Sequence, residues 1–305
     1  MTEAAGNRND EGTPNVPRSE PTPVSRSDGR PAGDAPASNK RSLPQAVATA
    51  LFLLGLMIVC YLLGTRAFFV LICAVVLLAE YELLSALKGA GRRPSVLLGL
   101  AGGLGMLAVA YSETLSSFGI VLALTLVAGF LWALRPQRGT SAGTDVAWLL
   151  MAVAWVGGGG AGAVLIMLLG PHGLNLLFAV VGSIAIGDIS AYFVGTSIGK
   201  RKMAPSISPG KSWEGFAAGI AGALAAGAVS GVVLDELDPL RGLLLGGLCG
   251  LLAPVGDLIE SMVKREIGIK DSSQLLPGHG GFLDRLDAIL FCCPAAYLYL
   301  NLVVF

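Results

Sequence analysis

Long apolar runs alternate with short polar connections over most of this 305-residue chain. From about residue 45 onward, each run is close to the length of about 20 residues that a helix needs to cross the hydrocarbon core of a bilayer. The pattern predicts about nine spanning helices. They cover residues 46–63, 67–87, 95–111, 115–134, 146–169, 173–195, 214–234, 240–261 and 283–304. We therefore predict an all-α fold, that of a polytopic integral membrane protein.

The first 44 residues differ in kind from the rest. They are rich in Pro, Gly, Ser, Asn and Asp and carry almost no large apolar side chains, so they cannot bury enough surface to offset the entropy of ordering. They also lack the basic region and apolar core of a signal peptide. We predict a disordered polar cytoplasmic tail over 1–44, scaffold helices that face lipid over 45–170, and helices that carry the reactive residues over 171–305.

Composition supports a membrane protein. The chain is 53% hydrophobic and 14% charged, with a mean hydropathy of +0.69, and most segments lack the charged faces that a soluble protein would place between its apolar stripes. The formal net charge of zero gives no indication of a nucleic-acid partner. Five cysteines lie inside apolar runs without metal-ligand spacing, and we interpret them as packing residues. They are Cys60, Cys73, Cys249, Cys292 and Cys293.

Lysine and arginine concentrate in every second connection between the predicted helices. Because cytoplasmic loops carry the basic excess, this alternation predicts a cytoplasmic N-terminus and a C-terminus outside the cell membrane. The connections on the predicted cytoplasmic side hold Lys40, Arg41, Lys88, Arg92, Arg93, Arg135, Arg138, Lys200, Arg201, Lys202, Lys211, Lys264, Arg265 and Lys270. The opposite connections hold little beyond Arg66 and Arg241.

Acidic residues gather at the predicted cytoplasmic ends of the last four helices. The first five helices contribute only Glu80 and Glu82 in comparable positions. Ionisable groups at the ends of helices in a membrane protein are unfavourable unless paired or facing water, so these acids are functional candidates. The residues in question are Asp188, Glu214, Asp257, Glu260, Asp271, Asp284 and Asp287.

Two of these acids suit a metal ion. Asp257 shares a helix face with Lys264, at i and i+7, and that polar face is either the wall of a water-filled cavity or an ion-pair stripe that only fixes packing. Asp284 lies in the first turn of the last helix, after the turn residues "PGHGG". Paired carboxylates suit Mg²⁺, and nearby lysine and arginine suit phosphate. This equipment is typical of phosphoryl or nucleotidyl transfer.

A second polar cluster covers residues 187–216. Its "PGKS" suggests a phosphate-binding P-loop, but Pro205 occupies the position of the first glycine and no strand pattern precedes it, so we reject that motif. Metalloprotease and serine-hydrolase motifs are absent from the sequence. A third feature is the glycine run Gly157–Gly160, which either lets helix backbones approach closely or breaks the predicted helix 146–169.

Together the two polar clusters resemble the phosphatidate cytidylyltransferases (CDP-diacylglycerol synthases). The upstream block contains Asp188, Tyr192, Gly195, Gly199 and Lys200, followed by "SPGKSWEG" over 208–215. The downstream block reads Ser261-x-x-Lys264-Arg265-x4-Lys270-Asp271, then x-Ser273-x2-Leu276-Pro277-x-His279-Gly280-Gly281-Phe282-x-Asp284-Arg285-Leu286-Asp287. The resemblance is specific over about 185–290 and only general over the apolar first half.

The resemblance implies that CTP and phosphatidate react at the cytoplasmic face to give CDP-diacylglycerol and pyrophosphate. It implies metal binding by Asp257 and Asp284, with Mg²⁺ and a K⁺ ion as a possible second cation, and it suggests a homodimer. The implied catalytic residues are Asp257, Asp284, Lys264, Arg285 and Asp287. The implied substrate-binding residues are Asp188, Tyr192, Lys200, Ser208, Lys211, Ser212, Glu214, Arg265, Lys270, Asp271 and His279, where His279 either touches substrate or only shapes its loop.

Two other functions remain open. Cytidylyl transfer to a different lipid phosphate would use the same headgroup chemistry, and nothing in the polar motifs separates the two acceptors. A secondary transporter would place its acids near the middle of the spans and show an internal repeat. In this chain the acids lie at one end of the helices and no repeat is visible, so the transporter is disfavoured.

Overall fold

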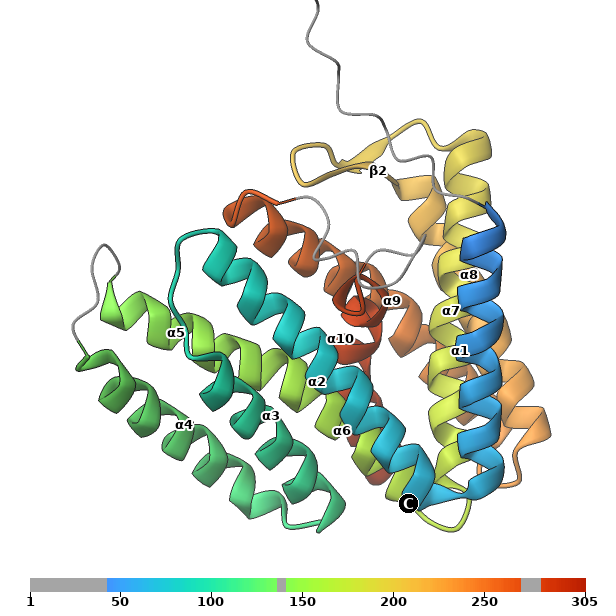
Figure 1. Cartoon of the computed structure of the whole chain (residues 1–305). Helices are drawn as coiled ribbons and strands as arrows, with labels where there is room; N and C mark the ends of the chain where they lie inside the picture. The colour runs from blue at the N-terminus through green and yellow to red at the C-terminus, as the bar shows by residue number, and fades with distance from the viewer. Residues whose placement is uncertain (1–42, 136–140, 270–280) are drawn as a thin grey trace, which may run out of the picture. The chain divides into compact units, whose positions relative to one another are not determined.

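Helices account for nearly all of the structure in this computed structural model, which describes residues 43–135, 141–269 and 281–305 (Figure 1). The N-terminal helices are α1 (Leu43–Leu63), α2 (Thr65–Gly89), α3 (Val96–Tyr111) and α4 (Phe118–Ala133), with a 3-10 turn at Leu115–Ser117. There follow α5 (Ala142–Ala152), a π-helical turn (Val153–Gly157), α6 (Gly158–Leu168) and α7 (Gly173–Ile198). The last helices are α8 (Trp213–Val233), α9 (Pro239–Glu266) and α10 (Leu283–Tyr299), which ends in a π-helical turn (Leu300–Val304).

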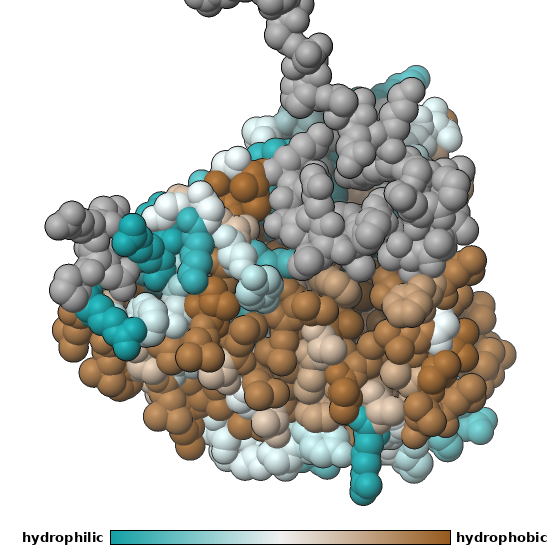
Figure 2. All heavy atoms as spheres, viewed as in Figure 1, coloured by the Kyte–Doolittle hydropathy of each residue, from teal (hydrophilic) through white to brown (hydrophobic). Residues whose placement is uncertain are grey.

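Seven helical segments among the described residues are long and apolar enough to cross a membrane. They are Thr65–Gly89, Leu115–Ala133, Ala142–Leu168, Gly173–Ile198, Trp213–Val233, Pro239–Glu266 and Leu283–Val304, and two shorter apolar helices cover Leu51–Leu63 and Val96–Tyr111. Large apolar side chains form a broad belt on the visible face, with hydrophilic residues beyond it (Figure 2). The predicted helical, polytopic membrane fold is confirmed. The count of nine spans and the sides of the two termini stay predictions.

The glycine run in the middle of the chain packs helices together and does not break them. Helices α5 and α6 continue into one another through the π-helical turn. A Cβ atom on Gly159 would collide with the backbone of Leu290, and one on Gly162 would collide with the backbone of Pro294. The absence of side chains therefore brings α6 against α10 at close range.

The prediction of an all-α chain misses one small hairpin. Strands β1 (Lys202–Ala204) and β2 (Ser208–Ser212) pair antiparallel, with Lys202 opposite Ser212 and Ala204 opposite Ser208. Because β2 contains Pro209 and Gly210, residues that strands disfavour, its sequence has no strand pattern. The hairpin replaces the loop that we predicted between the helices now labelled α7 and α8.

Helix α10 occupies a central position. It packs against α2 and α6 on one side and against α7 and α9 on the other (Figure 1). The cytoplasmic ends predicted for α7, α8, α9 and α10 therefore gather around the start of α10. The predicted division of the helices at residue 170 is not tested by this packing and stays a prediction.

Candidate active site

A cavity of about 510 Å³ lies where α7, β2, α8, α9 and the start of α10 meet. Half of the sixteen site residues that we predicted line it, although they come from segments far apart in the chain. The predicted site residues that line it are Asp188, Tyr192, Ser208, Lys211, Ser212, Asp257, Asp284 and Asp287. The polar faces of the final helices thus enclose one site, which supports the cavity interpretation of the stripe on α9.

Lys211 joins the hairpin to α9. Its Nζ atom lies 2.6 Å from Oδ2 of Asp257 and donates a hydrogen bond to the carbonyl oxygen of Pro254, at 3.1 Å. Pro254 lies inside α9, where proline cannot donate the usual backbone hydrogen bond. The side chain of Lys211 is 21% exposed and that of Asp257 is 43% exposed, and both residues line the cavity, so the ion pair is accessible from it.

Three carboxylates lie close enough together to share a cation. Ligand oxygens of Asp257, Glu260 and Asp287 all lie within 4.8 Å of one another. Three oxygen donors at this spacing form the hard ligand set that Mg²⁺ prefers, with remaining positions for water or phosphate oxygens. The chemistry of these residues therefore fits the predicted metal.

Asp284 is not one of these three carboxylates but lies beside them. Its Oδ1 atom accepts a hydrogen bond from Nζ of Lys264 at 3.2 Å, and its Oδ2 atom accepts one from the backbone N–H of Gly281 at 3.1 Å. Lys264 also pairs with Glu260, at 2.7 Å. The structure thus groups Glu260 and Asp287 with Asp257, whereas we predicted Asp284 as its partner, and the ligand pair itself stays a prediction.

We counted Glu260 among the acidic functional candidates but assigned it no role at the site. It is 2% exposed and lies one helical turn from Asp257, and this i, i+3 spacing already placed both acids on one face of the helix. Whether Asp284 or Asp287 of α10 approaches Asp257 depends on the rotation of α10 against α9. Sequence spacing within one helix carries no information about that rotation.

The upstream cluster contributes both lining and support. Asp188 and Tyr192 line the cavity from α7. Ser212 also caps α8, because its Oγ atom accepts a hydrogen bond from the backbone N–H of Gly215, at 3.2 Å. Glu214 accepts hydrogen bonds from the backbone N–H groups of Lys200 and Arg201. Glu214 therefore fastens the connection after α7 to the start of α8.

Other predicted residues either do not line this cavity or fall outside the described residues. Arg265 is exposed near the end of α9 and does not line the cavity. Arg285 lines a different, apolar cavity on the other face of α10. Lys270, Asp271 and His279 fall outside the described residues, so their predicted contacts stay predictions.

Glu82 is a functional candidate whose role the sequence did not indicate. Its Oε2 atom accepts a hydrogen bond from the backbone N–H of Leu283 at 3.0 Å, and its side chain is 2% exposed. The residue lies on α2, 201 positions before its partner. A carboxylate at the start of a helix interacts favourably with the bare N–H groups there. Glu82 thus fixes the turn that carries Asp284 and Asp287.

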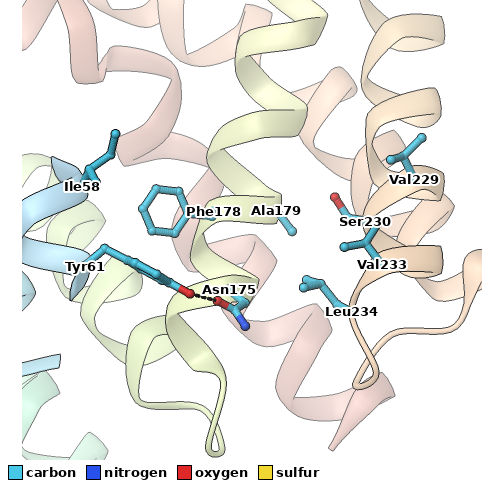
Figure 3. A pocket seen from close by; sticks show the side chains of 9 residues that line it. All are labelled: Ile58, Tyr61, Asn175, Phe178, Ala179, Val229, Ser230, Val233 and Leu234. Atoms are coloured by element: carbon cyan, nitrogen blue, oxygen red, sulfur yellow. Dashed lines mark hydrogen bonds between the residues drawn. The ribbon is translucent and has the colours of Figure 1, made fainter. Parts of the chain in front are cut away.

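A third hollow, of about 480 Å³, lies among α1, α7 and α8 (Figure 3). The hydroxyl of Tyr61 donates a hydrogen bond to Oδ1 of Asn175 at 2.9 Å beside it. Among the residues that the structure describes, no charged residue and no predicted site residue lines this hollow. It is therefore separate from the cavity lined by Asp188, Asp257, Asp284 and Asp287, which we call the acidic cavity.

Comparisons with known proteins agree with the resemblance found in the sequence. The model of the cytidylyltransferase family matches residues 44–303. The phosphatidate cytidylyltransferase of Mycobacterium bovis is 35% identical over 285 residues, which cover 86% of this chain and 90% of that protein. The enzyme of the same name from Bacillus subtilis is 46% identical over 132 residues, 43% of this chain and 49% of that protein. The predicted family is confirmed, and the chain belongs to the cytidylyltransferase family.

Proposed function

We propose that this protein transfers the cytidylyl group of CTP to phosphatidate and releases pyrophosphate. The observation that carries the proposal is the cavity between apolar helices in which Asp257 and Asp287, clustered with the buried Glu260, meet Lys211. Relatives that bear the name phosphatidate cytidylyltransferase match most of the chain. A water-soluble nucleotide and a membrane lipid need a site of this kind, which is polar inside and embedded in a membrane protein.

The reaction joins two phosphates. A phosphatidate phosphate oxygen attacks the α-phosphorus of CTP, a new P–O bond forms, and the bond between the α-phosphorus and the bridging oxygen of the β-phosphate breaks. Pyrophosphate leaves with that bridging oxygen and its electron pair. The nucleophile is already an anion, so the site does not require a general base. The main tasks of the protein are to align the two phosphates and to offset their charge.

The residues of the cavity divide these tasks. Asp257, clustered with Glu260 and Asp287 and with Asp284 lining the same cavity, would hold Mg²⁺, and K⁺ is the proposed second cation. Magnesium bound there would neutralise charge on the triphosphate and on the departing pyrophosphate. Lys211 and Lys264 already contact the acids and provide positive charge toward phosphate oxygens. Arg265, Arg285, Lys270 and the remaining predicted residues are proposed as further substrate contacts.

We also propose a location and an assembly. The positive-inside pattern supports a site on the cytoplasmic side of the cell membrane, where CTP is available. The glycine-rich helix faces and the family resemblance support a homodimer.

The direct test is an assay of label transfer. Detergent-purified protein is incubated with phosphatidate, Mg²⁺ and CTP labelled in its α-phosphate, and the label is measured in the lipid phase. We expect labelled lipid that disappears when EDTA removes the metal. Folded protein that labels no phosphatidate would refute the proposed acceptor. Label transfer to an isoprenoid or ether-lipid phosphate would then identify the alternative acceptor.

A further inference from the structure

Two cavities share the first turns of α10. The acidic cavity is lined by Asp284, Asp287 and Ala288 of this helix. The second cavity is lined by other residues of the same turns, namely Phe282, Arg285, Leu286, Ile289 and Leu290. At 3.6 residues per turn these two sets fall on opposite faces of the helix. The helix that carries the downstream polar block is therefore also the wall of an apolar chamber.

The second cavity is suited to a hydrocarbon chain. It has a volume of about 280 Å³, and residues of α1, α2, α6, α7 and α10 line it. Apart from glycines and Arg285, the described side chains that line it are all apolar. They are Leu53, Leu56, Met57, Phe68, Leu71, Ile72, Val75, Val76, Ala163, Leu177, Phe178, Val181, Phe282, Leu286, Ile289 and Leu290.

The lining extends along the helices rather than across them. On α10 it reaches from Phe282 to Leu290, about 12 Å at 1.5 Å per residue. At that level Gly159 and Gly160 of α6 lie against Leu290 and Val76 respectively. From Val76 the lining continues along α2 to Phe68, about another 12 Å. The chamber is thus long and narrow, with Arg285 toward one end and Phe178 toward the other.

Arg285 lies between the two cavities, on the side of the apolar one. It lies next to Asp284 in the sequence and is exposed, and it occupies the border between the two faces of α10. A guanidinium group binds phosphate oxygens in a fixed, bidentate geometry. A lipid whose phosphate approaches the acidic cavity around the start of α10 would meet Arg285 where its headgroup ends and its hydrocarbon begins.

We propose that the apolar cavity receives one acyl chain of the phosphatidate whose phosphate reacts in the acidic cavity. This inference rests on the proposed function and adds the location of the lipid tail. Burial of each methylene group in an apolar site is favourable, so affinity should rise with the length of the acyl chain. The narrow chamber holds a single chain, and the second chain of the lipid stays among the membrane lipids.

The test is a change of chain-length preference. Val181→Phe fills the chamber near Phe178, and Ala163→Leu fills it from α6. Each variant is assayed in the same mixed micelles with dipalmitoyl and with dioctanoyl phosphatidate. The kcat/KM for the dipalmitoyl lipid is divided by that for the dioctanoyl lipid, and this ratio is compared with that of the natural protein. We expect the ratio to fall about tenfold or more, because misfit by single methylenes changes recognition by that order. A short chain does not reach the filled region.

Matched controls separate this result from general damage. Val232→Phe and Ala225→Leu make the same changes at exposed positions of α8, and their ratios should stay unchanged. Val181→Phe is the second arm if Ala163→Leu does not fold, because Ala163 is only 8% exposed. An unchanged ratio in an active, folded Val181→Phe protein would refute the acyl-chain site and indicate a resident lipid instead. Natural protein that is inactive on both lipids would refute the proposed function, which is a different result.

Discussion

At the scale of single residues, the acids around Asp257 make two different kinds of contact. Asp287 and Glu260 place carboxylate oxygens near those of Asp257, whereas Asp284 contacts Lys264 and the backbone of Gly281. A metal ligand and an ion-pair partner respond differently to neutralisation of the side chain. Loss of a ligand weakens metal affinity, and loss of an ion-pair partner mainly disturbs position.

We expect Asp257→Asn and Asp287→Asn to raise the Mg²⁺ concentration for half-maximal activity about tenfold or more, as for damage to metal sites elsewhere. Asp284→Asn should lower turnover with a smaller change in that concentration, since it weakens one of the two contacts that position Lys264. The measurement is a Mg²⁺ titration of label transfer for each variant. If Asp284→Asn raises the Mg²⁺ requirement as much as Asp257→Asn, the ligand pair predicted from the sequence is the correct one.

Lys211 provides a second prediction at this scale. Lys211→Gln removes the charge that faces Asp257 at 2.6 Å. Hydrogen bonds to charged groups contribute about 1.5–3 kcal/mol, so kcat/KM should fall roughly tenfold to a hundredfold. Lys202→Gln, at an exposed position of the same hairpin, is the matched control and should keep its activity. Equal effects of the two variants would make the lost activity a property of the hairpin.

At the scale of elements, the start of α10 depends on α2. Glu82→Ala removes the acceptor for the backbone N–H of Leu283, and an unsatisfied buried donor costs about 1–3 kcal/mol. We expect a lower unfolding temperature in detergent together with lower turnover, and a smaller loss for Glu82→Gln, which keeps an acceptor. Glu113→Ala, at an exposed loop position, is the control. Full activity of Glu82→Ala would show that α10 holds its position without this contact.

Helices α8 and α9 depend on glycines for their close approach. A Cβ atom on Gly246 would collide with the backbone oxygen of Ala223, whereas one on Gly55 of α1 would meet nothing within 4 Å. Gly246→Ala should therefore destabilise the protein by about 1–3 kcal/mol, the usual range for overpacking. Gly55→Ala should be neutral or slightly stabilising, since alanine favours helix. Thermal unfolding in the same detergent compares the two variants directly.

At the scale of the whole molecule, sequence patterns predicted what depends on composition and spacing. Apolar runs predicted the helices, and the polar blocks at 187–216 and 261–287 predicted the family and most of the cavity lining. The hairpin escaped prediction because proline and glycine mask its strand character. The contact between Glu82 and Leu283 could not be predicted, because tertiary packing brings together helices that no local sequence pattern connects.

The orientation of the molecule in the membrane gives the last prediction. Basic residues flank the acidic cavity, at the hairpin between α7 and α8 and at the end of α9, and such residues are retained on the cytoplasmic side. Labelled CTP does not cross lipid, so sealed inverted vesicles from a bacterial expression host should label their lipid. Sealed right-side-out vesicles should do so only after permeabilisation, which also controls for the amount of enzyme. Labelling by the sealed right-side-out vesicles alone would place the cavity on the outer side, and equal labelling by both sealed preparations would make it accessible from both sides. Either result would leave the basic residues in need of another explanation.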